Sequence, residues 1–227
     1  MSPASAWIGV DESGKGDYFG PLVIAAVCVD EETAAMLRAS GVRDSKRLSD
    51  RTIADLAGDI PGLCRTSVVA IGPAKYNELY GKLKNLNRLL GWGHARAIEN
   101  VLEAGCPATR ALSDQFGDER FINDALMRKG RAIELQQRPR AEEDVAVAAA
   151  SVVARAEFVR RLDRLSEEAG LVLPKGASDL VDAAAKRLVR AKGKDALAAF
   201  AKIHFKTTVK VLGQETDVKN KRDPRSP

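Results

Sequence analysis

The hydrophobic positions of this chain repeat with two periods, one of about two residues and one of three to four. Apolar runs bounded by turn residues predict strands near residues 6–12, 21–29, 65–72, 109–114 and 131–136. Helical patterns lie between and after these segments. Three early strands, followed by strands that alternate with helices, predict an α/β fold with a mixed sheet.

The C-terminal third is predicted to be helical. Ala141–Leu165 is rich in alanine and has a charged face, and Asp179–Arg190 and Lys194–Ile203 have amphipathic patterns. Gly213–Pro227 mixes basic residues with acids and prolines and has no apolar face, so we expect a disordered basic tail. Residues 1–212 are then enough for one domain with a sizeable core.

The charge balance is compatible with a polyanionic partner. Lysine and arginine number 36 against 31 acids, which gives a formal charge of +5, and the sequence pI is about 9.1. No uninterrupted apolar run is long enough to span a membrane, and the N-terminus lacks the charged-then-apolar layout of a signal peptide. We therefore expect a cytoplasmic protein that acts away from membranes.

The cysteines give no sign of a metal site. Cys28, Cys64 and Cys106 are odd in number, lie in apolar or turn settings and lack metal-ligand spacing. We expect all three to be reduced structural thiols.

The segment from Trp7 to Val27 carries the strongest chemical signal. Asp11 and Glu12 end an apolar strand, where a buried carboxylate needs a cation or a hydrogen-bond network. Alternation sends the two side chains to opposite sides of the strand unless it breaks there, and the glycines that follow favour a break. The loop Gly14–Gly16, with Lys15 at its centre, suits a phosphate chain beside acids that bind divalent metals. A glycine turn with surface acids is the alternative.

This segment resembles the opening of ribonuclease HIII, a relative of ribonuclease HII. The family pattern is aspartate, glutamate, a small residue, glycine, a variable residue, glycine and then DYFGP, and residues 11–21 read DESGKGDYFGP. Similar blocks follow in the family's order, so that the resemblance covers residues 7–210. These blocks are RDSKRLSD (43–50), KYNELY (75–80), NLNRLLGWGHARAI (85–98), SDQF (113–116), VAVAAASVVAR (145–155), LPKGAS (173–178) and KIHFK (202–206).

The resemblance implies a fold and an activity. The expected fold is ribonuclease H-like, with a five-stranded mixed sheet flanked by helices and a helical C-terminal extension that forms one wall of the substrate groove. The expected enzyme cuts the RNA strand of RNA–DNA hybrids and leaves 5′-phosphate and 3′-hydroxyl ends. Two Mg2+ or Mn2+ ions would serve this reaction, and such a pair needs three or four carboxylates.

The expected metal ligands come from separate parts of the chain. Asp11 and Glu12 are the first two, and Asp114, which ends the apolar stretch Ala111–Leu112, is the third. Asp114 could instead cap a helix that starts near Asp118.

The fourth acid is predicted to be Glu142, which precedes the alanine-rich helix in a context similar to that of the family. Its spacing from Ser151 is one residue short, so Glu143 and Asp144 remain rivals. All three could instead be acids that favour the first turn of a helix.

Several residues are candidates for contact with the substrate. The backbone of Gly14, Lys15 and Gly16 matches the family element that senses the ribose 2′-hydroxyl. Phosphate contacts are predicted for Ser45, Lys46, Asn85 and Asn87, with a salt-bridged turn and helix capping as the alternatives. His94 has the helical spacing of a packed or half-buried residue rather than of a catalytic base.

The resemblance leaves alternatives open. Ribonuclease HIII commonly carries an N-terminal substrate-binding domain, whereas the predicted catalytic strand begins here at Trp7 and leaves no room for one. Incision at single ribonucleotides in duplex DNA, as in ribonuclease HII, is one alternative activity. A catalytically silent hybrid-binding protein is another. We expect a monomer whose partner is the RNA–DNA hybrid.

Overall fold

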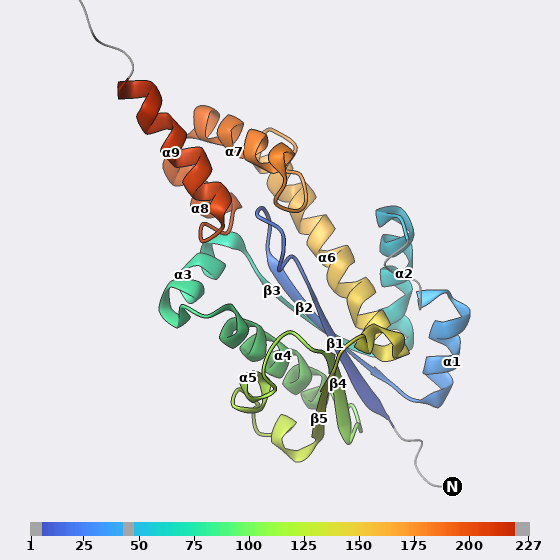
Figure 1. Ribbon diagram of the computed structural model, residues 1–227. Coiled ribbons are helices and arrows are strands. Elements are labelled where there is room, and N and C mark those ends of the chain that lie inside the picture. The colour runs from blue at the N-terminus through green and yellow to red at the C-terminus, as the bar shows by residue number, and fades with distance from the viewer. Residues whose placement is uncertain (1–5, 43–47, 221–227) are drawn as a thin grey trace, which may run out of the picture.

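The computed structural model describes residues 6–42 and 48–220, with side chains described as far as Gly213. Two predicted phosphate contacts, Ser45 and Lys46, lie outside the described residues. The order of the elements along the chain confirms the predicted alternation of strands and helices (Figure 1).

The centre of the molecule is a five-stranded mixed sheet with the order β3-β2-β1-β4-β5. β1 pairs with β2, and β2 with β3, in antiparallel register, whereas β1–β4 and β4–β5 are parallel pairs. The predicted mixed sheet and the ribonuclease H-like fold class are confirmed. The strands are β1 (Trp7–Ser13), β2 (Leu22–Val29), β3 (Arg65–Ile71), β4 (Arg110–Asp114) and β5 (Glu134–Arg138).

Helices cover both faces of the sheet, because apolar side chains alternate to both sides of β1 and β2. α6 crosses one face and α4 lies on the other, and each packs on its own hydrophobic cluster (Figure 1). The α-helices are α1 (Glu31–Ala39), α2 (Asp50–Leu63), α3 (Pro73–Leu83), α4 (Leu86–Glu103), α5 (Arg120–Asn123), α6 (Val145–Ala169), α7 (Asp179–Lys192), α8 (Leu197–Phe200) and α9 (Lys206–Asn220). Three short 3-10 turns are η2 (Gly130–Ala132), η3 (Ala141–Glu143) and η4 (Lys194–Ala196).

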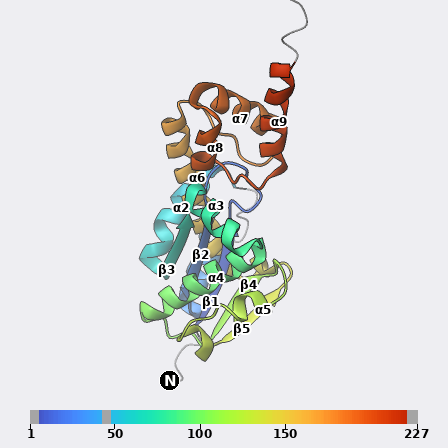
Figure 2. The ribbon, with the colours of Figure 1, turned by 90° about the vertical axis from the view of Figure 1, so that its left-hand side faces the viewer.

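The C-terminal helices form a separate layer at one end of the sheet. In both views α7, α8 and α9 gather beyond the loop that joins β1 to β2 (Figures 1 and 2). The predicted helix Lys194–Ile203 is wrong for its last three residues, because α8 ends at Phe200 and Ala201 is extended. Ala201 pairs instead with Phe19, so a tertiary contact overrides the helical pattern.

The start of the predicted C-terminal tail lies within a helix. α9 continues past Gly213 to Asn220, and residues 221–227 lie outside the described part. The predicted domain boundary at residue 212 stays a prediction. In the part of the chain that the structure describes, every helix is too short or too polar to cross a membrane.

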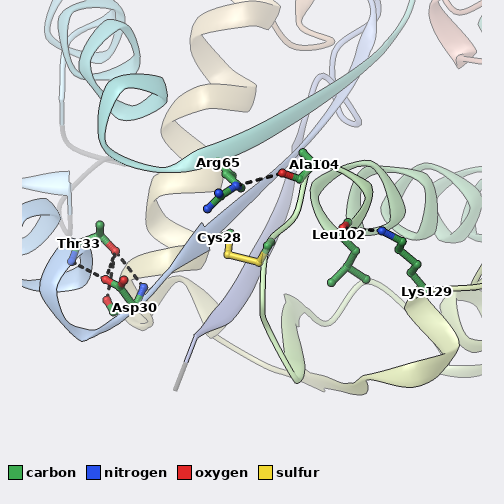
Figure 3. Close-up of a disulfide and its surroundings, with 8 residues drawn as sticks. Cys28, Asp30, Thr33, Arg65, Leu102, Ala104 and Lys129 are labelled. Carbon is green, nitrogen blue, oxygen red and sulfur yellow. Dashed lines mark hydrogen bonds between the residues drawn. A yellow bond between two sulfur atoms is a disulfide. The ribbon is translucent and has the colours of Figure 1, made fainter. Parts of the chain in front are cut away.

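The expectation of three reduced thiols is wrong for two of them. Cys28 and Cys106 form a disulfide that joins the end of β2 to the loop after α4, with 6.2 Å between their Cα atoms (Figure 3). This pairing could not be predicted from the sequence, because the two cysteines are 78 positions apart and only the folded sheet brings them together. Cys64 is a buried free thiol, as predicted, and burial raises its pKa.

Candidate active site

Two predicted acids meet where the parallel pairing of β1 with β4 ends. The register pairs Gly9 with Leu112 and Val10 with Ser113, so Asp11 and Asp114 follow directly in neighbouring strands. Parallel strands place corresponding residues at the same edge of a sheet. Residues 103 positions apart in the chain thus come together, as the predicted metal site requires.

Asp11 and Glu12 point to opposite faces of the sheet, as their alternation predicts, because β1 continues unbroken to Ser13. On the α6 face, the Ser151 hydroxyl hydrogen-bonds to Asp11. On the α4 face, the Nε2 atom of His94 lies 3.1 Å from Oε2 of Glu12. The break predicted for this region comes only at Gly14.

His94 is completely buried, which confirms the prediction of a packed residue. Its Nδ1 atom lies 3.0 Å from the hydroxyl of Ser113, the neighbour of Asp114. Its ring also contacts Phe116, with 4.9 Å between the ring centroids. The contacts with Glu12 and Ser113 were not predicted, since helical spacing shows that a residue is packed but not against what.

The two neighbouring carboxylates have opposite pKa shifts. Burial, followed by the negative charge of Glu12, raises the pKa of Asp11 to about 7. Burial would also raise the pKa of Glu12, but the hydrogen bond and charge of His94 and the nearby Lys15 outweigh it, so that this pKa lies below its ordinary value. Among the described residues, the charge of His94 therefore compensates Asp11 less than it compensates Glu12.

The segment before α6 separates the three rivals for the fourth acid. The Ala141 N–H donates to Oδ1 of Asp114 at 3.2 Å, which brings Glu142 next to a predicted ligand. Glu142 is half-buried, whereas Glu143 is exposed to solvent. Asp144 has a different task, because its Oδ1 accepts from the Ala146 N–H at 2.8 Å and caps α6. Glu142 as the fourth acid stays a prediction.

The glycine loop begins where β1 ends. Gly14 has φ of +87°, and a Cβ there would lie 2.2 Å from the carbonyl oxygen of Pro21, so the turn requires glycine. Gly16 is exposed and has open space around it. The Nζ atom of Lys15 lies 3.4 Å from Oε1 of Glu12 and 5.7 Å from the centroid of the Phe116 ring. Gly16 thus presents its backbone to solvent beside the acids, whereas Gly14 is buried.

The two asparagines lie at the start of α4. Oδ1 of Asn85 accepts from the N–H groups of Asn87 and Arg88, at 2.9 and 3.3 Å, and so caps the helix. The Asn87 side chain is half-buried against Gly117. Capping therefore accounts for Asn85, and its predicted contact with phosphate stays a prediction.

The chemistry of these side chains fits divalent metal ions. Carboxylate oxygens are the ligands that Mg2+ and Mn2+ prefer, and a cation would stabilise the charged form of the half-buried Asp11, whose pKa is raised. Within residues 6–42 and 48–220, no three acidic, histidine or cysteine side chains already converge as a metal site. One reason is that the Glu12 carboxylate is directed to His94 on the α4 face of the sheet, whereas Asp11 lies on the α6 face.

The chain is similar to known proteins over most of its length. The family Ribonuclease HII matches residues 8–208. Ribonuclease HIII of Protochlamydia amoebophila is 50% identical over 208 residues, covering 91% of this chain and 68% of the relative. Ribonuclease HIII of Chlamydia pneumoniae is 48% identical over 202 residues, covering 88% of this chain and 68% of the relative.

Solved structures show the same similarity. The crystal structure of Bst-RNase HIII in complex with Mn2+ superposes with a TM-score of 0.86 at 35% identity, covering 94% of this chain and 71% of that one. Aquifex aeolicus RNase H3 superposes with a TM-score of 0.72 at 33% identity, covering 87% of this chain and 71% of that one.

Proposed function

Since the chain belongs to the ribonuclease HII family, we propose that it is an endonuclease that uses divalent metal ions to hydrolyse the RNA strand of RNA–DNA hybrids. The observation that carries this proposal is the convergence of Asp11 and Asp114 at adjacent strand ends, beside the turn that bears Glu142. We further propose that the products carry 5′-phosphate and 3′-hydroxyl ends and that the chain acts as a monomer.

Four carboxylates would hold the metal ions: Asp11, Glu12, Asp114 and Glu142. When bound, two divalent ions supply the Lewis acidity that phosphodiester hydrolysis needs. The chain contributes the positions of the carboxylates. The sheet fixes Asp11 and Asp114, and the Ala141 N–H fixes Asp114 relative to the turn that precedes α6.

The Glu12 carboxylate is held by side chains rather than by the backbone of the sheet. Its carboxylate is shared between His94 and Lys15, at 3.1 and 3.4 Å. His94 keeps Glu12 ionised, since the hydrogen bond and the charge of the imidazole both lower the pKa of Glu12. A rotation of the Glu12 side chain away from Lys15 would release the lysine for a phosphate as the carboxylate takes up a metal ion.

The backbone of Gly14, Lys15 and Gly16 would recognise the RNA strand. Gly16 is exposed and has no neighbouring atom that would block an approaching ribose, and the 2′-hydroxyl is the group that distinguishes RNA from DNA. Lys15 adds a cation beside the acids. Asn85 and Asn87, together with Ser45 and Lys46, are proposed to contact the phosphates, which supply most of the salt-sensitive affinity.

The substrate class is tested with labelled duplexes. We expect cleavage at many positions of an RNA–DNA hybrid in Mg2+ or Mn2+ and none in chelator. A duplex with a single ribonucleotide serves as the comparison, and its preferential incision would place the activity with ribonuclease HII instead. Binding of the hybrid without cleavage in either metal would leave a silent binding protein. Product ends are checked by removal of the 5′-phosphate with phosphatase, followed by gel mobility.

A further inference from the structure

Lys202 is a completely buried lysine in the segment that follows α8. Its Nζ atom donates to the carbonyl oxygens of Asp17 and Gly20, both at 2.7 Å, and lies 3.4 Å from that of Phe19. The same atom lies 5.7 Å from the centroid of the Tyr76 ring in α3. A buried amine is costly unless it is hydrogen-bonded, and here all its acceptors belong to one loop.

That loop is residues 17–20, directly after the glycine element. The C-terminal region binds it through the backbone as well, since the Lys202 N–H donates to the Tyr18 carbonyl at 2.8 Å and the Gly20 N–H donates to the Phe200 carbonyl at 3.0 Å. A second C-terminal segment adds the Gly176 N–H, which donates to Oδ1 of Asp17 at 2.6 Å.

Carbonyl oxygens that converge on one point need a donor with several N–H groups. Lysine supplies up to three from a single atom, whereas an apolar residue of the same volume supplies none. Without Lys202, the carbonyls of Asp17 and Gly20 would lose the side-chain donor that they have inside the protein. The loop would then have to shift or admit water.

We propose that Lys202 is a positioning residue for recognition of the RNA strand. It holds residues 17–20 against the C-terminal layer and thereby fixes Gly14–Gly16, the element that we propose reads the 2′-hydroxyl. This inference rests on the proposed function.

Lys202 acts on binding more than on chemistry. Asp11 and Asp114 are fixed by the sheet and by the Ala141 N–H, none of which Lys202 contacts. Loosening the loop should therefore weaken hybrid binding while the metal requirement is unchanged.

The test compares Lys202→Met with Lys192→Met, which removes the same charge from an exposed position at the end of α7. For Lys202→Met we expect KM for the hybrid to rise about tenfold while kcat stays within about twofold. Lys192→Met should leave both constants near the wild-type values. The proposal would be overturned if folded Lys202→Met had the wild-type KM. It would also be overturned if kcat fell about tenfold while KM was unchanged.

Amide hydrogen exchange of residues 14–20 provides a measurement that needs no substrate. Exchange should be faster in Lys202→Met than in either the wild type or Lys192→Met, and equal exchange would overturn the proposal. If the wild type cleaves no hybrid but Lys202→Met exchanges faster, the proposed function fails while the attachment of the loop stands.

A milder variant covers the case in which Lys202→Met does not fold. Tyr18→Phe keeps the packing of the loop and removes only the contact between the Tyr18 hydroxyl and Oγ1 of Thr208, at 3.1 Å. This contact also joins the loop to the C-terminal layer. We therefore expect KM and the exchange rate to rise as in Lys202→Met but less, by about twofold to threefold. The absence of both changes would contradict the coupling.

Discussion

The imidazole of His94, which α4 supplies, bridges the two strands that carry the acids. Its Nε2 atom lies 3.1 Å from Oε2 of Glu12 in β1, and its Nδ1 atom lies 3.0 Å from the hydroxyl of Ser113 in β4. It is fully buried, so these hydrogen bonds are shielded from water. His94 thereby sets the orientation of Glu12 relative to the strand that ends in Asp114.

Replacing His94 by glutamine should lower activity through Glu12. We expect kcat/KM to fall about 10- to 100-fold and the metal concentration for half-maximal rate to rise, as is usual when a residue that orients a metal ligand is lost. Metal titrations of the rate, with thermal unfolding as a check on folding, measure this. An unchanged metal requirement would show that Glu12 is oriented without His94.

The segment before α6 allows a matched test of the fourth acid. Glu142→Gln should lower kcat more than about 100-fold, because it removes one carboxylate from the proposed metal site. Glu143→Gln is the control, since that side chain is exposed, and should stay within about twofold of the wild type. Single-turnover cleavage of a hybrid measures both. The reverse order of effects would move the assignment to Glu143.

Asp144 should affect stability rather than catalysis. Its Oδ1 accepts from the Ala146 N–H and from Nε1 of Trp7, at 2.8 and 3.1 Å. Asp144→Ala should therefore lower the free energy of unfolding by about 1 to 2 kcal/mol, as expected for a lost N-cap with an added hydrogen bond. Urea unfolding measures this change. If Asp144→Ala lost turnover under conditions in which it is fully folded, Asp144 would instead be a metal ligand.

Gly9 marks the close approach of α6 to β1. A Cβ at this position would lie 2.1 Å from the carbonyl carbon of Ala146 and 2.2 Å from the Val147 nitrogen, and both are backbone atoms that cannot rotate away. We expect Gly9→Ala to destabilise the fold by about 3 kcal/mol. Gly58→Ala is the control, because Gly58 is exposed in α2 with open space around it and should be neutral or stabilising. Equal stabilities in urea unfolding would contradict this packing.

Lys202 should make stability depend on pH. Burial lowers its pKa in the folded protein to about 7 from an ordinary 10.5. Between these values the unfolded chain binds more protons than the folded one, so the contribution of Lys202 to stability rises with pH and is constant below pH 7. We expect the unfolding free energy of the wild type, relative to that of Lys202→Met, to rise by up to about 1.4 kcal/mol per pH unit from pH 7 to 10. A constant difference in unfolding free energy would show that the three carbonyl oxygens keep the pKa of the lysine near its ordinary value.

Much of the fold could be predicted from the sequence because its pattern is locally consistent. Alternation and turn residues located all five strands, and the apolar period located α6 and α7. The bounds shifted by a few residues, as with β5, which begins at Glu134 rather than near 131. Ala201 is different, since its pairing with Phe19 depends on a partner that is distant in sequence.

The sequence predicts the acids of the candidate site but not the contacts that support them. Asp11, Glu12 and Asp114 stand out because acids end apolar strands. The links from His94 to Glu12 and from Lys202 to the glycine loop leave no local signal, because each joins segments 82 or more residues apart. The disulfide Cys28–Cys106 escaped prediction for the same reason.

The most direct test of the proposed function is cleavage of a labelled RNA–DNA hybrid by the wild type and Asp114→Asn, each in Mg2+, in Mn2+ and in chelator. Asp114→Asn is nearly isosteric and can still accept from the Ala141 N–H, so the variant should keep its fold. We predict metal-dependent cleavage by the wild type and a loss of more than about 100-fold in the variant. Cleavage that persists in chelator, or that survives the loss of the Asp114 charge, would contradict a metal-dependent ribonuclease built on these carboxylates.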